Sequence, residues 1–317
     1  MDMSTQARTG IIDFYNPQER ARSQPLRIHS FTSGHHAYEP ARTNCFSIIR
    51  VQCGSCSVAI DDASHEVNAG ALLFTTPYQH VRFSPHEPLT AQMIEFHSNF
   101  LCVETFHAEV GCAGKLFNDP YSIPVITPDR HADAEIVGLF AQIEREQKNQ
   151  ELAYAEASLA LVKVLLIRAT RWKAEHEETC ETALAGHRHP ALQQLGELIE
   201  RHYCALHSPA EYASQLHMSA KSLGRLVRDH LGVTPTHLIR KRILTHAKWQ
   251  LLHTLRSVKE IAVELGFNDE LYFSRLFKKA TGVSPTYFRE FETEIRGGSN
   301  LSMSWGSTSI VKPTSSH

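Results

Sequence analysis

Two short stretches in the last third of the chain place cationic and polar side chains where they could read DNA bases or hold phosphates. In both, hydrophobic residues recur at i, i+3 and i+4, so the polar residues between them lie on the opposite face of a helix. Arginine can pair with guanine through two hydrogen bonds, glutamate can accept one from cytosine, and lysine suits phosphate oxygens. The candidate DNA-binding residues are Lys221, Ser222, Arg225 and Arg228 in the first stretch, and Glu270, Leu271, Ser274, Arg275, Lys278 and Lys279 in the second.

The hydrophobic residues of the two stretches predict which face of each helix is buried. We expect this buried set to be Leu223, Leu226 and Val227, then Phe273, Leu276 and Phe277. Gly224 leaves one position of the first helix without a side chain. The second helix is therefore expected to discriminate bases more strongly, and the first to contribute more to positioning.

An internal repeat predicts the elements that position these helices. Residues 208–211 (Ser-Pro-Ala-Glu) recur as 257–260 (Ser-Val-Lys-Glu), and each has the Ser and Glu of a capping box at a helix start. Residues 232–235 (Gly-Val-Thr-Pro) recur as 282–285 (Gly-Val-Ser-Pro), where glycine ends one helix and proline begins the next. Each repeat thus reads as a helix-turn-helix unit.

The two predicted helix-turn-helix units span residues 208–230 and 257–281, and a helix is expected between them from Pro235 to Thr254. Twenty helical residues extend ~30 Å, close to the ~34 Å that separates successive major grooves on one face of DNA. A connecting helix of this length would set two readers about one turn of DNA apart.

Charge is divided unevenly along the 317 residues. The chain carries a net charge of −2, yet residues 207–291 contain 13 Lys and Arg against 7 Asp and Glu. A basic segment attached to an acidic remainder is the split expected when one part meets a polyanion.

With these motifs in place, residues 190–291 resemble the DNA-binding domain of the AraC/XylS family. The string that carries the resemblance is Glu260-Ile-Ala262, Gly266-Phe-Asn-Asp269, Tyr272 to Lys279, Gly282, Ser284-Pro285 and Tyr287-Phe-Arg289. The first unit departs from the family pattern at Tyr212 and Val227. The resemblance implies double-stranded DNA, RNA polymerase and a small-molecule effector as partners, a homodimer, and activation more often than repression.

The preceding residues predict a different architecture. Short strands rich in branched and aromatic residues occupy about 26–125, and helical patterns follow from about His131. The fold class expected is α+β: an N-terminal cupin-like β-barrel with dimerisation helices, then an all-α domain with two helix-turn-helix units. We expect domains at 1–174 and 190–291, a polar linker at 175–189 and a disordered tail at 292–317.

Tyr78, His80 and Arg82 are the candidate effector-binding residues. They follow a strand-to-loop stretch, residues 70–80, similar to one common in the barrels of this family. The mouth of a barrel is a frequent ligand site.

No cofactor or metal is expected. The strands lack the His-x-His, glutamate and later histidine of a cupin metal enzyme, and the pair Cys53 and Cys56 has no second Cys-x-x-Cys. A looser cluster, comprising His97, Cys102, His107 and Cys112, could bind a metal but lacks a defining pattern.

The chain contains no apolar run long enough for a membrane span, a polar N-terminus without a signal-peptide core, and seven scattered cysteines. These features predict a cytoplasmic protein without membrane association. Two alternatives to a ligand-responsive regulator stay open: an effector-independent regulator whose barrel serves dimerisation or protein contacts, and a cupin-like metal enzyme with a DNA-binding appendage.

Overall fold

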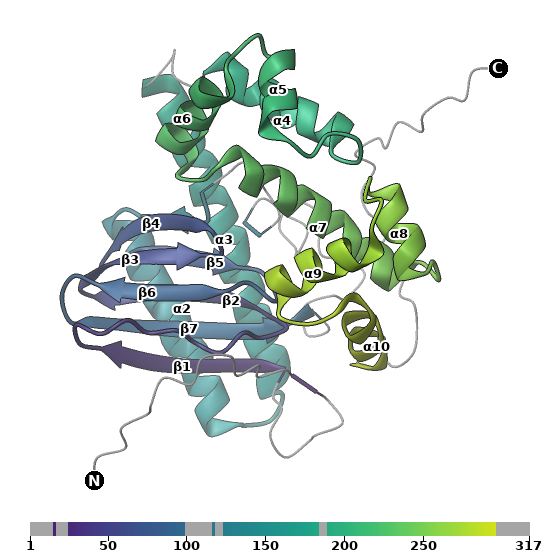
Figure 1. Cartoon of the computed structure of the whole chain (residues 1–317). Coiled ribbons are helices and arrows are strands. Elements are labelled where there is room, and N and C mark those ends of the chain that lie inside the picture. The colour runs from purple at the N-terminus through teal and green to yellow at the C-terminus, as the bar shows by residue number, and fades with distance from the viewer. Residues whose placement is uncertain (1–14, 17–24, 99–115, 118–122, 184–188, 296–317) are drawn as a thin grey trace.

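The computed structural model describes residues 15–16, 25–98, 116–117, 123–183 and 189–295 (Figure 1). Strands fill the first part and helices the second. The strands are β1 (Leu26–Ser33), β2 (Cys45–Cys53), β3 (Ser55–Ile60), β4 (Ala63–Asn68), β5 (Leu72–Thr75), β6 (Val81–Pro85), β7 (Leu89–His97) and β8 (Val125–Ile126). The helices are α2 (Arg130–Asn149), α3 (Tyr154–Ala183), α4 (Pro190–His202), α5 (Pro209–Gln215), α6 (Ala220–Leu231), α7 (Pro235–His253), α8 (Val258–Glu264), α9 (Glu270–Thr281) and α10 (Pro285–Ile295).

The strands form two antiparallel sheets, one with the order β1-β7-β2-β5-β8 and one with the order β4-β3-β6. Residues at alternate positions of β3, β4 and β6 are buried, which is the pattern of a sheet with one solvent-exposed face. The core between the sheets includes Ile49, Val58, Leu73 and Phe83. The expected β-rich N-terminal domain is confirmed.

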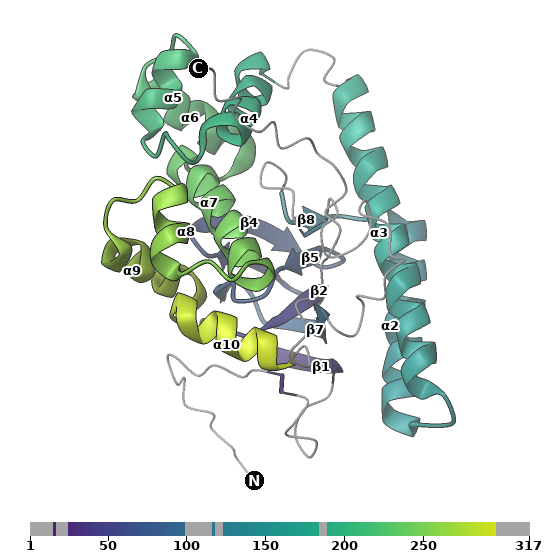
Figure 2. The ribbon, with the colours of Figure 1, turned by 90° about the vertical axis from the view of Figure 1, so that its right-hand side faces the viewer.

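Helices α2 and α3 pack against each other and cover the outer face of the five-stranded sheet (Figure 2). Ile136, Phe140, Val162 and Leu165 are buried in their shared core with the sheet. Of the structure's described helices, none is long and apolar enough to cross a membrane.

The predicted linker at 175–189 is wrong over its first half, because α3 continues to Ala183. Its residues, including Glu175, Glu177 and Glu178, are polar but include good helix formers, and neither Gly nor Pro interrupts them before 183. The segment is therefore helical up to residue 183 despite its polarity. Residues 184–188 lie outside the described part.

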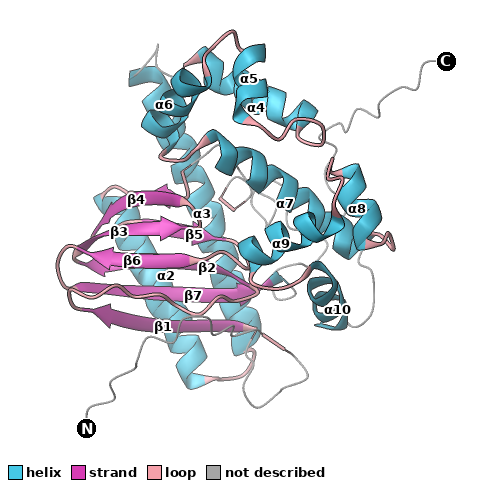
Figure 3. Ribbon diagram, in the orientation of Figure 1, coloured by secondary structure: helices cyan, strands magenta, loops and turns pink. Residues whose placement is uncertain are grey.

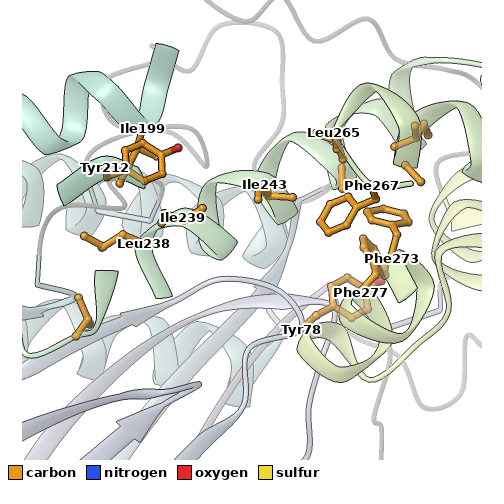
Figure 4. Packing of buried hydrophobic residues seen from close by; sticks show 14 of the residues in the cluster. Tyr78, Ile199, Tyr212, Leu238, Ile239, Ile243, Leu265, Phe267, Phe273 and Phe277 are labelled. Atoms are coloured by element: carbon orange, nitrogen blue, oxygen red, sulfur yellow. The ribbon is translucent and has the colours of Figure 1, made fainter. Parts of the chain in front are cut away.

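The C-terminal half contains two short helix pairs, α5–α6 and α8–α9, joined by α7 (Figure 3). Helix α7 lies between the pairs and supplies Leu238, Ile239 and Ile243 to one continuous core that also holds Tyr212 and Phe273 (Figure 4). The expected connecting helix is confirmed at 19 residues.

The final helix extends the domain beyond its expected end at residue 291. Helix α10 runs to Ile295, and Glu292 and Ile295 are buried. The predicted boundary was wrong because the Arg-Gly-Gly stop begins only at residue 296. The rest of the expected tail, residues 296–317, lies outside the described residues.

Candidate nucleic-acid interface and the domain contact behind it

Both helix-turn-helix units begin with a complete capping box. In the first, the Ser208 side chain accepts from the backbone of α5 and Glu211 accepts from the Ser208 N–H at 2.9 Å. In the second, Ser257 and Glu260 repeat the arrangement, with the Ser257 N–H to Glu260 distance at 2.7 Å. These reciprocal bonds satisfy the free N–H groups of the first turn and set the start of each unit.

The turn of the second unit depends on Gly266, which has a φ of +81°. A Cβ added at this position would lie 2.0 Å from the carbonyl oxygen of Cys204. The turn therefore needs glycine for two reasons, a left-handed backbone and a close approach to the chain that follows α4.

The two second helices, α6 and α9, are set in the same way. Ser219 caps α6 and Asp269 caps α9, and each helix ends at a glycine with positive φ, Gly232 or Gly282. The predicted buried faces are confirmed for Leu223 and Val227 in α6 and for Phe273 and Phe277 in α9, whereas Leu226 and Leu276 are half-buried.

The candidate DNA-contacting residues lie on the opposite, outward faces. Ser274 is half-buried, and the exposed ones are Lys221, Ser222, Arg225, Arg228, Glu270, Leu271, Arg275, Lys278 and Lys279. The arginines have local partners that water and DNA can replace. The Arg225 guanidinium lies 3.4 Å from Asp229, and that of Arg275 donates to the Leu271 carbonyl at 3.3 Å. The two helices thus present cations and hydrogen-bonding groups to the solvent.

The C-terminal end of α9 contacts the barrel. Arg42, in the segment between β1 and β2, donates through Nη1 to the Ala280 carbonyl at 3.1 Å and to that of Lys279 at 3.5 Å. These are the free carbonyls at the negative end of α9, so a guanidinium there is favourable. The first unit has a related contact, since a Cβ on Gly232 would lie 3.3 Å from the Ser64 carbonyl of β4.

A buried polar contact joins the barrel to α10. The Tyr78 hydroxyl donates to the Glu292 carboxylate, and Nε2 of His97, at the end of β7, lies 3.6 Å from the same carboxylate. All three residues are buried. Nearby on α7, Lys248 donates to the Pro77 carbonyl at 3.2 Å.

The candidate effector residues separate in the structure. Tyr78 and His80 line a cavity between the barrel and the DNA-binding helices, whereas Arg82 is absent from its lining. Arg82 lies on the outer face of β6, 3.4 Å from Glu39, because its neighbours Val81 and Phe83 occupy the inward positions of the strand. The expectation that all three would reach one barrel mouth is wrong for Arg82.

Sequence reasoning did not single out Arg42, Lys248 or Glu292, which make the contact between the two halves. One signal was present: apolar residues surround much of α7, as in a helix packed on more than one side. The hydrogen-bonded partners across this contact are 171 to 238 positions apart in the sequence. No local sequence pattern connects residues at that separation.

One small cavity inside the barrel, about 20 Å³, is lined by residues such as Ser47, Ile49 and Met93. A single water needs roughly 10–15 Å³ on the same measure. This cavity has space for a water molecule but not for a sugar-sized ligand.

Cys53 and Cys56 flank the turn from β2 to β3, and their side chains differ in burial, with Cys53 exposed and Cys56 buried. Burial raises the pKa of Cys56 to about 11, with Glu66 adding to it, so its thiol stays protonated. Gly54, between them, has a φ of +88°, and a Cβ there would lie 2.4 Å from the Pro88 carbonyl. The spacing of the pair follows from this tight turn. Of the other candidate metal cluster, Cys102, His107 and Cys112 lie outside the described residues.

Comparison with known proteins matches both halves of the chain to family models. Residues 26–162 match the AraC-like ligand binding domain, and residues 212–290 match the helix-turn-helix domain. Together these two models account for the β-rich domain with its helices and for the two helix-turn-helix units.

Curated relatives of this chain include transcription regulators. The chain is 29% identical to the transcriptional activator RhaS of Enterobacter sp. (strain 638) over 48% of its own length and 52% of the relative's. It is 28% identical to the arabinose operon regulatory protein of Salmonella typhimurium over 51% of its length and 56% of that protein. The matched part thus spans about half the length of these curated relatives. Among solved structures, ToxT from Vibrio cholerae O395 aligns over 84% of this chain and 98% of its own at 12% identity, with a TM-score of 0.36.

The matched modules are those of a regulator and not of an enzyme, so the alternative of a metal enzyme is wrong. With a ligand-binding module followed by two helix-turn-helix units, the chain belongs to the AraC family of transcription regulators.

Proposed function

We propose that this protein activates transcription by holding promoter DNA in two successive major grooves through α6 and α9. The observation that carries the proposal is the pair of outward faces on two matched helices, fixed to one rigid helix, α7. At 19 residues, α7 extends ~28 Å, a length compatible with two readers one turn of DNA apart.

The outward side chains divide into two roles by chemistry. Arg225, Arg275 and Glu270 lie in the N-terminal two-thirds of their helices and suit base edges. Arg228 and Lys278 lie one turn later and suit phosphates. Lys279 also lines the cavity behind α9, so its role belongs partly to the contact with the barrel.

The N-terminal half is the proposed sensing and dimerisation unit. The pair α2–α3 lies on the side of the barrel away from the DNA-binding helices (Figure 2), which leaves its outer face available to a second copy of the chain. In this proposal the protein acts in the cytoplasm as a homodimer, responds to a small-molecule effector, and contacts RNA polymerase when bound to DNA. The domains are 1–183 and 189–295, with the junction in the residues between.

The test is DNA protection mapping with the full chain on the region upstream of its own gene and its neighbours. We expect two protected segments per monomer, about 10 base pairs apart, and affinity that falls steeply with salt because Lys and Arg displace counterions. Equal affinity for promoter DNA and for random DNA at every salt concentration would contradict the proposal, and so would protection of one groove only.

A further inference from the structure

A cavity of about 220 Å³ lies between the two halves of the molecule, behind α7 and α9. Its walls come from the β3–β4 turn, the loop after β5, Arg42, α7 and the end of α9. A single water needs roughly 10–15 Å³ on this measure, so the cavity has room for a small organic molecule.

Positive charge dominates the lining. Arg42, Arg240, Lys241, Lys248 and Lys279 contribute five cations, and Asp61 and Asp62 the two carboxylates. The carboxylate of Asp61 is already engaged inside the barrel turn, where it accepts from Gln79 Nε2 at 3.0 Å and from the His80 N–H at 2.9 Å.

The hydrogen bonds of Arg42 and Lys248 do not neutralise their charges. Arg42 donates to the Ala280 carbonyl and Lys248 to the Pro77 carbonyl, both of which are neutral acceptors. Burial of a cation is costly, and Asp61 and Glu292 offset that cost only in part at Lys248, whose pKa stays lowered. An anion in the cavity would offset more of it.

Two ionisable groups of α7 have lowered pKa values, with burial as the largest cause. The pKa of Lys248 falls to about 8: burial lowers it, Asp61 and Glu292 oppose the shift, and Arg42 and Lys241 add to it. The pKa of His237 is also lowered, first by burial and then by Lys241, against Asp61 and Asp62.

The rest of the lining is apolar. Leu244 of α7, Leu276 of α9 and Phe117 line the cavity together with Tyr78. A site with clustered cations beside aliphatic and aromatic side chains suits a ligand that carries both a negative charge and an apolar body.

We propose that this cavity binds a small organic anion, a carboxylate or a phosphate ester, with its charged group at Arg42 and Lys248 and its apolar body against Leu244 and Leu276. The inference rests on the proposed function, since it names the chemical class of the effector. It places the effector between the domains and not inside the barrel. Such a ligand would contact the barrel, α7 and α9 at once, so its binding and that of DNA would be linked.

The experiment is titration calorimetry of the full chain with benzoate, phenyl phosphate and inorganic phosphate, and with benzamide as the neutral counterpart of benzoate. We expect benzoate or phenyl phosphate to bind, and to do so more tightly than benzamide and inorganic phosphate. The tighter binder of benzoate and phenyl phosphate shows whether the site prefers a carboxylate or a phosphate ester. At pH 8, binding should take up protons because an anion raises the pKa of Lys248.

The variants are Lys248→Met and Arg42→Gln, which each remove one charge at the cavity. Loss of a charge-assisted hydrogen bond predicts a roughly 10- to 100-fold weaker affinity. The matched control is Arg171→Gln on α3, an exposed cation on the far side of the barrel, which should leave affinity unchanged. Thermal unfolding tests whether each variant is folded. If one is not, Arg240→Gln, at an exposed position of the lining, takes its place.

Equal affinity for benzoate and benzamide, unchanged affinity in both cavity variants, or no binding of either aromatic anion in the millimolar range would overturn the inference. Specific DNA binding is measured on the same samples. If DNA binding persists while the anions fail to bind, the inference falls and the proposed function stands. If the protein binds no DNA specifically, the proposed function fails by itself.

Discussion

The hydroxyl of Tyr78, in the loop after β5, donates a hydrogen bond to the carboxylate of Glu292 in α10. Both side chains are buried, and the Tyr78 ring packs on Phe288 with centroids 5.1 Å apart. One residue of the barrel thus supplies both a polar and an aromatic contact to the last helix of the DNA-binding half.

Replacing Tyr78 with phenylalanine should lower the free energy of unfolding by about 1–3 kcal/mol, because the Glu292 carboxylate would stay buried with one donor fewer. Denaturant titration measures the change. In a double-mutant cycle with Glu292→Leu, whose side chain cannot accept the hydrogen bond, the two effects should not add, since each variant removes the same contact. Additive effects would show that the two side chains act independently.

The second prediction concerns base reading by α9. Arg275→Ala should weaken binding to the specific site by ~1–3 kcal/mol, with little change on random DNA, because the side chain is exposed and aimed away from the core. Competition binding on both DNAs measures this. Lys259→Ala, which removes an exposed cation from α8, is the control. An equal loss on both DNAs would instead make Arg275 a phosphate contact.

Two glycines give opposite predictions for the same substitution. Gly266→Ala should destabilise the second unit by several kcal/mol, because its backbone is left-handed and a Cβ would collide with the Cys204 carbonyl. Gly224→Ala, inside α6 with no atom within 4 Å of an added Cβ, should stabilise by roughly 0.5–1 kcal/mol. Thermal unfolding of both variants measures the difference. Similar effects of the two substitutions would contradict this assignment.

A fourth prediction concerns acid sensitivity. Burial, together with the nearby Arg242 and Arg256, lowers the pKa of His246 from 6.5 to about 4. Its ring is hydrogen-bonded to Tyr203 and to Gln250, at 2.9 and 3.1 Å. Between these pH values the unfolded chain binds a proton that the folded chain does not, so stability should fall as pH decreases through this window.

The measurement is the free energy of unfolding across that pH range, for the natural chain and for His246→Gln. The variant should show a shallower fall, because its side chain does not titrate. His65 and His237, whose pKa values are also lowered by burial, retain part of the slope. An unchanged slope would show that His246 does not contribute to it.

The sequence by itself determined the features that depend on neighbours along the chain. The capping boxes at Ser208 and Ser257, the glycine stops at 232 and 282, and the buried faces of α6 and α9 are local patterns, and the structure has each of them where the repeat predicts. Such features follow because helix starts, stops and periodicity are set within a few residues.

Only the tertiary structure decided how the two halves meet. Tyr78 and Glu292 are 214 positions apart, and Arg42 and Ala280 are 238 apart. The partner of a buried polar group depends on which surfaces pack together, and hydrophobic packing is not directional. For the same reason Tyr78, expected at a barrel mouth, lies in a domain contact, and Arg42 and Lys279 join the cations of α7 from distant parts of the sequence.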